Sequence, residues 1–176
     1  KMRNLFAVIA ITLTTVLFCS LFAICSSLLA SMEESMMRQV GGNAHAGFKF
    51  LTVEEYETIS KHPDIKEISY TVALAAAENP ELVKRSSEIR YANDALAAEM
   101  MFAKPTTGRL PEASNELATD TLVLDKLGIP AKLGETVTLQ YSVCDKKYEE
   151  AFTLVGFWEG DIVMPASQIW LCKEYV

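Results

Sequence analysis

The sequence predicts an α+β protein with one N-terminal transmembrane helix and a mixed α/β domain outside the cytoplasm. Three observations carry this prediction: a long apolar run without charges, a helix-forming continuation up to Gly41-Gly42, and a period-two alternation over residues 136–158 that is typical of an antiparallel hairpin. The predicted parts are a cytoplasmic end (1–4), a transmembrane helix (5–30), a helical stalk (31–42) and an extracytoplasmic domain (43–176) built as one domain or as two small lobes.

The apolar run from Leu5 to Leu29 has the length of a membrane span. No charged residue lies between Arg3 and Glu33, and at about 1.5 Å per residue the run covers a hydrocarbon layer of roughly 30 Å. The alternatives are a buried core helix and a cleavable signal peptide, whose apolar region has only about 7–15 residues. Hydroxyl residues within the run can bond back to helix carbonyls. The sequence therefore favours a bilayer span.

Charge gives the orientation and excludes some partners. Lys1 and Arg3 precede the span, and Glu33 and Glu34 follow it, so the N-terminus is expected to stay in the cytoplasm. The chain has 23 acidic and 16 basic residues. Because the excess of acidic residues lies beyond the span, it repels nucleic acid and anionic lipid headgroups, and we expect neither as a partner of the outer domain.

The outer domain is predicted to open with a βαβ-like unit. Residues 44–51 are rich in Gly and aromatics and suit a first strand. Thr52 and Glu55 form a capping box for a helix to about Lys61, and a strand follows from Ile65. On that strand four apolar residues share one face: Ile68, Tyr70, Val72 and Leu74.

The middle of the chain alternates short elements with turns. A polar loop over 77–87 precedes a short strand at 88–91, and Asn93 is expected to cap a helix that includes Leu96, Met100 and Met101. The proline-containing segment 104–116 is predicted to be an irregular loop and a candidate boundary between lobes.

The last third carries the strongest strand signals. Thr119 or Asp120 is expected to cap a helix over 121–127, with Gly128 at its end. Strands over 136–143 and 148–158 are predicted to form a hairpin around a turn at 145–147. Residues 161–176 are ambiguous between strand and helix, and the chain stops there without a closing turn, which suggests truncation.

No constellation in the sequence carries chemistry, so no catalytic, cofactor-binding or metal-ligating residue is predicted. His45 and His62 are the two histidines, and neither has a second metal ligand at helical spacing. A cluster of carboxylates at Glu54, Glu55 and Glu57 is explained by the first turn of a helix. Gly41-Gly42 reads as a helix stop because no phosphate-loop pattern follows it. We therefore expect a protein that is not an enzyme and has no cofactor.

Four cysteines are shared equally between the span and the outer domain. Cys19 and Cys25 lie in the apolar run, where thiols behave as small hydrophobic groups. An extracytoplasmic location permits Cys144 and Cys172 to pair, but spacing alone does not establish the Cα separation that a disulfide requires. The sequence leaves that pairing open.

The order of these signals resembles the permease subunits of ABC transporters of the FtsX/MacB type. Residues 107–138 are similar to the MacB-like periplasmic core pattern "GR.P....E......L...LG...GD.V", and Phe152, Leu154 and Gly156 match the "F.L.G" that follows it. The first pattern is carried by Gly108, Arg109, Pro111, Glu116, Leu127, Gly128, Leu133, Gly134 and Glu135. Residues 3–24 also resemble the first helix of Firmicutes-type members.

The resemblance implies the N-terminal part of a longer permease in the cell membrane. A separate cytoplasmic ABC ATPase subunit would hydrolyse ATP, and the stalk at 31–40 would convey movement to the outer domain, which handles or exports a substrate of unknown identity. It also implies a second permease copy or a paired permease as a partner, within the lipid bilayer. The alternatives are a single-pass extracytoplasmic sensor or binding domain of a signalling protein and a membrane-tethered enzyme.

Overall fold

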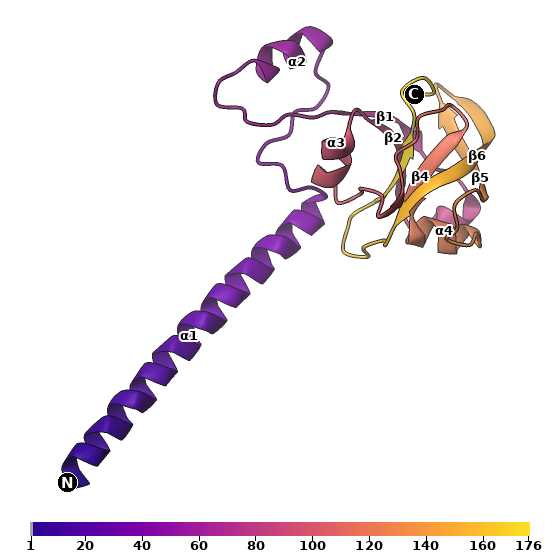
Figure 1. The fold of residues 1–176 in the computed structure, drawn as a ribbon. Coiled ribbons are helices and arrows are strands. Elements are labelled where there is room, and N and C mark those ends of the chain that lie inside the picture. The colour runs from indigo at the N-terminus through magenta and orange to yellow at the C-terminus, as the bar shows by residue number, and fades with distance from the viewer. Residues whose placement is uncertain (1) are drawn as a thin grey trace. The chain divides into compact units, whose positions relative to one another are not determined.

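The computed structural model describes residues 2–176, which form two compact units, one reaching to Met37 and the other comprising Arg38–Val176. Lys1, part of the predicted cytoplasmic end, lies outside the described residues. The elements are α1 (Met2–Val40), α2 (Val53–Ser60), β1 (Thr71–Ala76), η1 (Pro80–Leu82), β2 (Ser87–Ala92), α3 (Ala95–Met100), β3 (Thr107–Gly108), β4 (Glu116–Asp120), α4 (Thr121–Leu127), β5 (Thr136–Val143), β6 (Lys146–Trp158) and β7 (Ser167–Leu171) (Figure 1).

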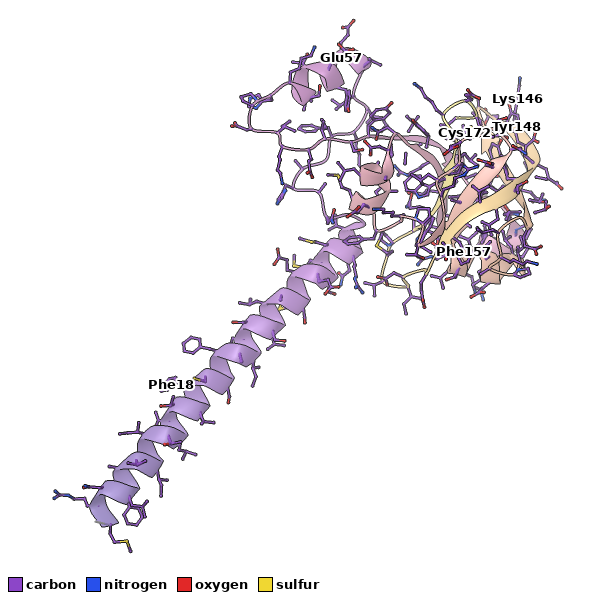
Figure 2. The ribbon with its side chains drawn as sticks, in the orientation of Figure 1. Phe18, Glu57, Lys146, Tyr148, Phe157 and Cys172 are labelled. Atoms are coloured by element: carbon purple, nitrogen blue, oxygen red, sulfur yellow. The ribbon has the colours of Figure 1, made fainter. Side chains whose placement is uncertain are left out.

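Helix α1 is a single uninterrupted helix of 39 residues. At 1.5 Å per residue it is about 58 Å long, so it exceeds the roughly 30 Å hydrocarbon layer by about half its length. It contains no buried residue, and side chains, Phe18 among them, project from it on every side (Figure 2). Gly41 follows with a φ of 87°, a left-handed conformation that suits the residue after a helix. The predicted continuity of the helix from the apolar run into the segment after it is confirmed.

The second unit is built around a curled mixed sheet, which confirms the α+β class. The strand order is β1-β2-β7-β4-β6-β3, and β5 pairs with β6. β7 runs parallel to β2 and antiparallel to β4, whereas β4 runs parallel to β6. A bridge between Ala77 and Tyr141 brings the chain after β1 to β5 and curls the sheet toward closure.

The core lies in two clusters of this unit. The larger one packs α4 and η1 against the sheet and contains Leu82, Ile89, Leu117, Val123, Leu124, Val137, Leu139, Tyr141, Phe152, Leu154, Ile169 and Leu171. The smaller one surrounds Trp170 with Ala92, Ala97, Ala98, Ala103, Ala118 and Trp158. Small alanines next to one indole allow α3 to approach the sheet closely.

The predicted hairpin is confirmed, with its turn one residue earlier than expected. β5 and β6 pair antiparallel from Thr136↔Thr153 to Val143↔Lys146, and Val137, Leu139 and Tyr141 are buried as the alternation requires. Cys144 and Asp145 have φ values of 48° and 65°. Two positive φ values are typical of the type I′ turn, whose twist matches that of the paired strands.

The predicted first strand at 44–51 is wrong. These residues form no strand, and Phe48 and Phe50 are 61% and 100% exposed. The next strand also differs, because β1 begins at Thr71 instead of Ile65 and Val72 is exposed. A bulge between Ala73 and Ala75 shifts the register. Local β propensity does not form a strand without a partner edge, and 44–51 has none among the described residues.

The helices and the remaining strands refine other predictions. α2 has the predicted capping box between Thr52 and Glu55, and Asp120 caps α4, one of the two predicted residues. The cap of α3 is Asp94, one residue after the predicted Asn93. The strand predicted at 88–91 is β2. The loop predicted over 104–116 contains the two-residue β3 and gives the first residue of β4, and the ambiguous C-terminal segment contains β7.

Candidate functional site

Helix α1 is long and apolar enough to cross a lipid bilayer. Three of its hydroxyl groups bond back to the helix: Thr14 and Thr15 donate to the carbonyls of Ala10 and Ile11 at 2.8 Å, and Ser20 donates to Val16 O at 2.7 Å. These back-bonds remove the cost of leaving a donor unpaired in hydrocarbon. The helix is thus compatible with a membrane, and a cleavable signal sequence near an N-terminus would satisfy the same length and composition.

The last turn of α1, from Arg38, belongs to the sheet-containing unit and contacts the loop between β6 and β7. Arg38 Nη1 lies 3.4 Å from Asp161 Oδ2. The other carboxylate oxygen of Asp161 accepts the Val163 N–H at 2.8 Å, which fixes its own loop. We call residues 161–164 the β6–β7 loop. Asp161 therefore joins this loop to the end of the helix with both of its carboxylate oxygens.

The residues that follow α1 make two more contacts with this unit. A Cβ on Gly41 would lie 3.4 Å from Pro165 Cγ, so the backbone of Gly41 passes close to the end of the β6–β7 loop. The Asn43 N–H donates to Met100 O at 2.9 Å, at the last residue of α3. The chain leaving the helix is therefore held by a backbone hydrogen bond and by close packing.

Arg85 also binds the β6–β7 loop, through hydrogen bonds that do not involve the helix. Its guanidinium donates from Nη2 to Asp161 O at 3.0 Å, from Nη1 to Met164 O at 2.9 Å and from Nε to Ser167 Oγ at 2.9 Å. Its side chain is half-buried in the segment just before β2, and the Ser167 N–H donates to the neighbouring Ser86 O. One planar donor group thus fixes both ends of the loop.

Asp120 is a buried carboxyl group beside this network. It is 3% exposed, and burial raises its pKa, whereas hydrogen bonds from Ser167 and the Val123 N–H and the charge of Arg85 oppose that rise. Ser167 Oγ accepts from Arg85 Nε and lies beside Asp120. The neighbouring Gln168 is 5% exposed, and its Oε1 has no hydrogen-bond partner among the described residues. A buried carboxylate close to a half-buried guanidinium reduces the cost of burying either charge.

A second connection runs through α3 to the centre of the sheet. Trp170 in β7 is fully buried, and its indole N–H donates to Ala103 O at 2.7 Å. This bond ties the segment after α3 to the core, and Met100 at the end of α3 accepts the Asn43 N–H described above. The residues just after α1 are therefore linked to β7 through α3 as well as through the β6–β7 loop.

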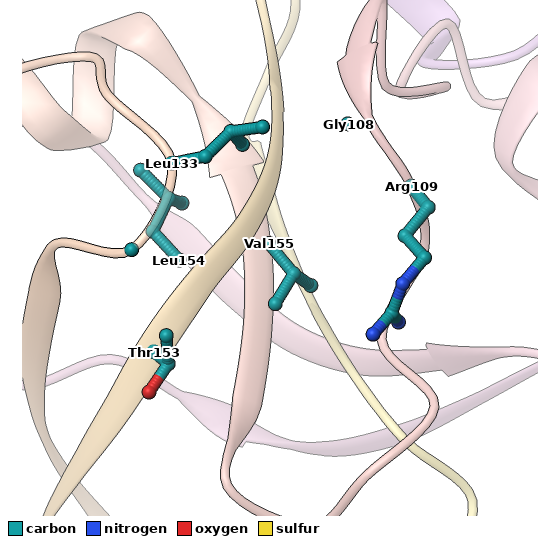
Figure 3. A pocket seen from close by; sticks show the side chains of 7 residues that line it. Gly108, Arg109, Leu133, Thr153, Leu154 and Val155 are labelled. Atoms are coloured by element: carbon teal, nitrogen blue, oxygen red, sulfur yellow. The ribbon is translucent and has the colours of Figure 1, made fainter.

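Another candidate is an open hollow of about 470 Å³ beside β6, lined by Gly108, Arg109, Leu133, Gly134, Thr153, Leu154 and Val155. Figure 3 shows Gly108 and Arg109 on one side of it, Leu133 and Thr153 on the other, and Val155 between them. Arg109 forms a bidentate pair with Glu116, at 2.8 Å to Oε2 and 2.6 Å to Oε1. Because its guanidinium is already paired, the hollow has no cation free to recognise an anion.

The residues that carry the family-like pattern have structural roles here. A Cβ on Gly108 would meet the carbonyl oxygen of Val155, and one on Gly156 would meet that of Arg109. Glu116 also accepts the N–H groups of Glu112 and Ala113. Together with the hydrogen bonds from Arg109 these lower the pKa of Glu116 to about 2. The pattern therefore describes how β3 and the start of β4 pack around β6.

Comparison with protein-family models and with curated proteins found no match to this chain. The family resemblance described above therefore rests on the quoted residues alone.

The structure does not bring the histidines and the clustered glutamates of the sequence analysis together into one site. His45 is exposed, and His62 Nδ1 accepts the Asp64 N–H within its own turn. Glu54 and Glu55 lie in the first turn of α2, with Glu55 in the capping box, and Glu57 pairs with Lys61 at 4.0 Å. Among residues 2–176 no group of three or more His, Cys, Asp or Glu side chains could hold a metal ion.

The two outer cysteines are both free. Cys144 is exposed at the tip of the β5–β6 turn, whereas Cys172 is buried beyond the end of β7. Cys172 is 3% exposed and is part of the packed interior. The pairing that the sequence left open is absent from this structure.

Sequence reasoning missed Arg85 and Asp161, the two residues at the centre of the candidate site. Arg85 was assigned to a polar loop, and Asp161 to a segment of ambiguous structure. The guanidinium of Arg85 donates hydrogen bonds to three carbonyl or hydroxyl oxygens of residues 161–167. No local pattern in the sequence reveals such a contact, because it depends on β2 and β7 being neighbours in the sheet.

Proposed function

We propose that this chain is the N-terminal part of an ABC transporter permease subunit of the FtsX/MacB type. In this proposal α1 crosses the cell membrane with its N-terminus in the cytoplasm, and the sheet-containing unit lies outside. A separate ABC ATPase subunit hydrolyses ATP, and the permease, working as a pair, transmits the resulting movement to the outer unit. The chain has no catalytic chemistry of its own in this mechanism.

The observation that supports the proposal best is the way α1 ends. The helix continues without a break for ten residues beyond its apolar part, to Val40. Its last turn is then joined to the sheet-containing unit by the Arg38–Asp161 pair and the bond from Asn43 to Met100. An unbroken helix resists bending, and it can pass a displacement along its axis to whatever holds its end.

Topology can be tested with the thiols of the chain itself. A variant with Cys19→Ala and Cys25→Ala keeps the exposed Cys144 as its reactive thiol, because Cys172 is buried. We expect a membrane-impermeant maleimide to label Cys144 on intact cells. Met2→Cys, placed in a version that also carries Cys144→Ser, should be labelled only after the cells are permeabilised. Labelling of Met2→Cys on intact cells would contradict the proposed orientation.

The permease assignment needs a partner test. The membrane-embedded protein, purified in mild detergent, should retain a protein with an ABC-type phosphate-binding loop, identified by mass spectrometry, and ATP hydrolysis should accompany it. A chain that is correctly oriented in the membrane but is associated with a kinase or cyclase domain would support a sensor and overturn the transporter assignment. A soluble chain would overturn both.

A further inference from the structure

We propose that Arg85 is the positioning residue that keeps the end of α1 in register with the sheet, by holding the β6–β7 loop against the last helical turn. The role of Arg85 in transmitting movement rests on the proposed function. Its effect on the order of residues 38–43 does not, because the contacts involved lie entirely within the sheet-containing unit.

The first step of the argument is the set of groups that Arg85 joins. Three of its donors are used on three acceptors spread over seven residues, from Asp161 O to Ser167 Oγ. A guanidinium presents its donors in a rigid planar fork, so the three bonds fix the relative positions of their acceptors. The loop between those acceptors contains Ile162 and Val163, which are 79% and 42% exposed and so contribute little packing.

The second step is that the loop has few other anchors. Met164 is buried, and its N–H donates to Asp161 O at 3.3 Å, while Val163 N–H donates to Asp161 Oδ1. Both of those bonds are internal to the loop. They shape it but do not attach it to the sheet, whereas the bonds from Arg85 connect it to the start of β2. Removal of the guanidinium therefore leaves the loop held by buried Met164, by the Arg38–Asp161 pair, and by backbone bonds at its two flanks, from Gly160 N–H to Thr121 Oγ1 and from Ser167 N–H to Ser86 O.

The third step connects the loop to the helix. Asp161 accepts from Arg85 through its backbone oxygen and pairs with Arg38 through its side chain. Asp161 therefore contacts two guanidinium groups, those of Arg85 and Arg38. If the backbone of Asp161 moves, its carboxylate moves with it, and Arg38 loses an ion-pair partner at the point where the helix ends. Arg85 acts on the helix through Asp161 without touching it.

The test measures a distance within the sheet-containing unit of the whole membrane-embedded chain. Spin labels are placed on Val40→Cys, in the exposed last turn of α1, and on the native Cys144, in a Cys19→Ala/Cys25→Ala background. The distance distribution should be narrow with Arg85 present. It should become about twofold broader in Arg85→Met and be broadened less in Arg85→Lys, which keeps the charge but cannot reproduce three bonds.

Arg90→Met is the matched control. Arg90 is also a half-buried arginine, within β2, and among the described residues its side chain bonds to Glu88, at 2.6 Å, and to Thr71 instead of the β6–β7 loop. The control removes the same charge and should leave the distribution narrow. Amide exchange at Val163 and Met164 provides a second measurement, and protection there should fall at least about tenfold in Arg85→Met.

The outcomes separate this proposal from the proposed function. A narrow distribution in folded Arg85→Met or Arg85→Lys would overturn the role of Arg85, whatever the chain does in the cell. If Arg85→Met does not fold, Arg85→Lys decides the matter, with near-ultraviolet circular dichroism confirming its packing. Equal broadening in Arg90→Met would also overturn the proposal, because the effect would then follow from lost charge. Failure to find an ATPase partner would leave the distance result standing.

Discussion

Helices α2 and α4 begin in the same way and differ in what they contribute to the fold. Each has a side chain that caps its first turn, Thr52 for α2 and Asp120 for α4. α2 contains no buried residue, whereas Val123 and Leu124 of α4 are completely buried against the sheet. Caps therefore determine where these helices begin, and burial determines which of them stabilises the unit.

The same contrast extends to the segments around them. Residues 43–52 make few contacts and expose their aromatic side chains, and α2 and its connections run outside the body of the sheet (Figure 1). By contrast β3 and β6 lie so close together that a glycine is required on each, at Gly108 and Gly156. Substitutions of buried or closely packed residues in 107–158 should therefore have larger effects than substitutions in 43–60.

The largest effect is expected from a methyl group at the contact between β3 and β6. Gly108 has a φ of 80°, and its Cβ would collide with a backbone oxygen of β6. We predict that Gly108→Ala lowers the free energy of unfolding by about 3 kcal/mol or more, through strain and backbone displacement. Urea denaturation provides the measurement. Gly47→Ala is the control, since a Cβ there has no atom within 4 Å, and an equal loss in both variants would contradict the contrast.

A smaller effect should follow from truncation of the buried face of α4. Leu124 is 0% exposed in the larger core cluster, so Leu124→Ala should cost about 2–5 kcal/mol through lost burial and the cavity left behind. Val53→Ala in α2 removes a side chain that is 74% exposed, and it should change stability by less than about 0.5 kcal/mol. If thermal unfolding shows similar losses for both, α2 is packed more tightly than this structure indicates.

The pH dependence of the Arg109–Glu116 pair should give an intermediate effect. The pKa of Glu116 is lowered from 4.5 to about 2 in the folded chain, so its stabilising contribution is complete above pH 4.5 and is lost as the pH falls toward 2. Wild type should unfold roughly 2–4 °C above Glu116→Gln near pH 7. This difference in unfolding temperature should disappear as the pH falls from 4.5 to 2.

Glu112→Gln is the appropriate control for that measurement. Glu112 lies 3.8 Å from the same arginine but is 78% exposed, and an exposed pair contributes little to stability. The unfolding temperature of Glu112→Gln should follow that of wild type across the pH range. A difference between wild type and Glu116→Gln that persists at pH 2 would show that the pair does not depend on ionisation of Glu116.

The sequence predicted elements well where the pattern is local. The hairpin alternates apolar and polar residues because one of its faces is buried, so its strands were found and its turn was misplaced by one residue. The capping box of α2 and the helix stop at Gly41 also depend on neighbouring residues only. For the same reason the uninterrupted length of α1 was predictable from composition.

The central strands and the candidate site could not be predicted in this way. β4 and β7 are buried along almost their whole lengths, so they lack the alternation that reveals a strand exposed on one side. Residues 44–51 have the composition of a strand but no partner edge. Arg38, Arg85 and Asp161 meet only because β2 and β7 pair, and each is unremarkable in its local sequence.

The smallest global effect should come from removing the cap of α2. The Thr52 hydroxyl accepts the Glu55 N–H at 3.3 Å, and the Thr52 N–H donates to the Glu55 carboxylate at 2.8 Å. Thr52→Ala removes the hydroxyl, so amide protection in the first turn of α2 should fall about fivefold. The global unfolding midpoint should not move, because α2 buries no residue of the core. Asp120→Ala, which removes the cap of α4, should lower that midpoint. Equal shifts in the two variants would mean that a helix with no buried side chain still unfolds together with the sheet, and that capping alone can couple an element to the core.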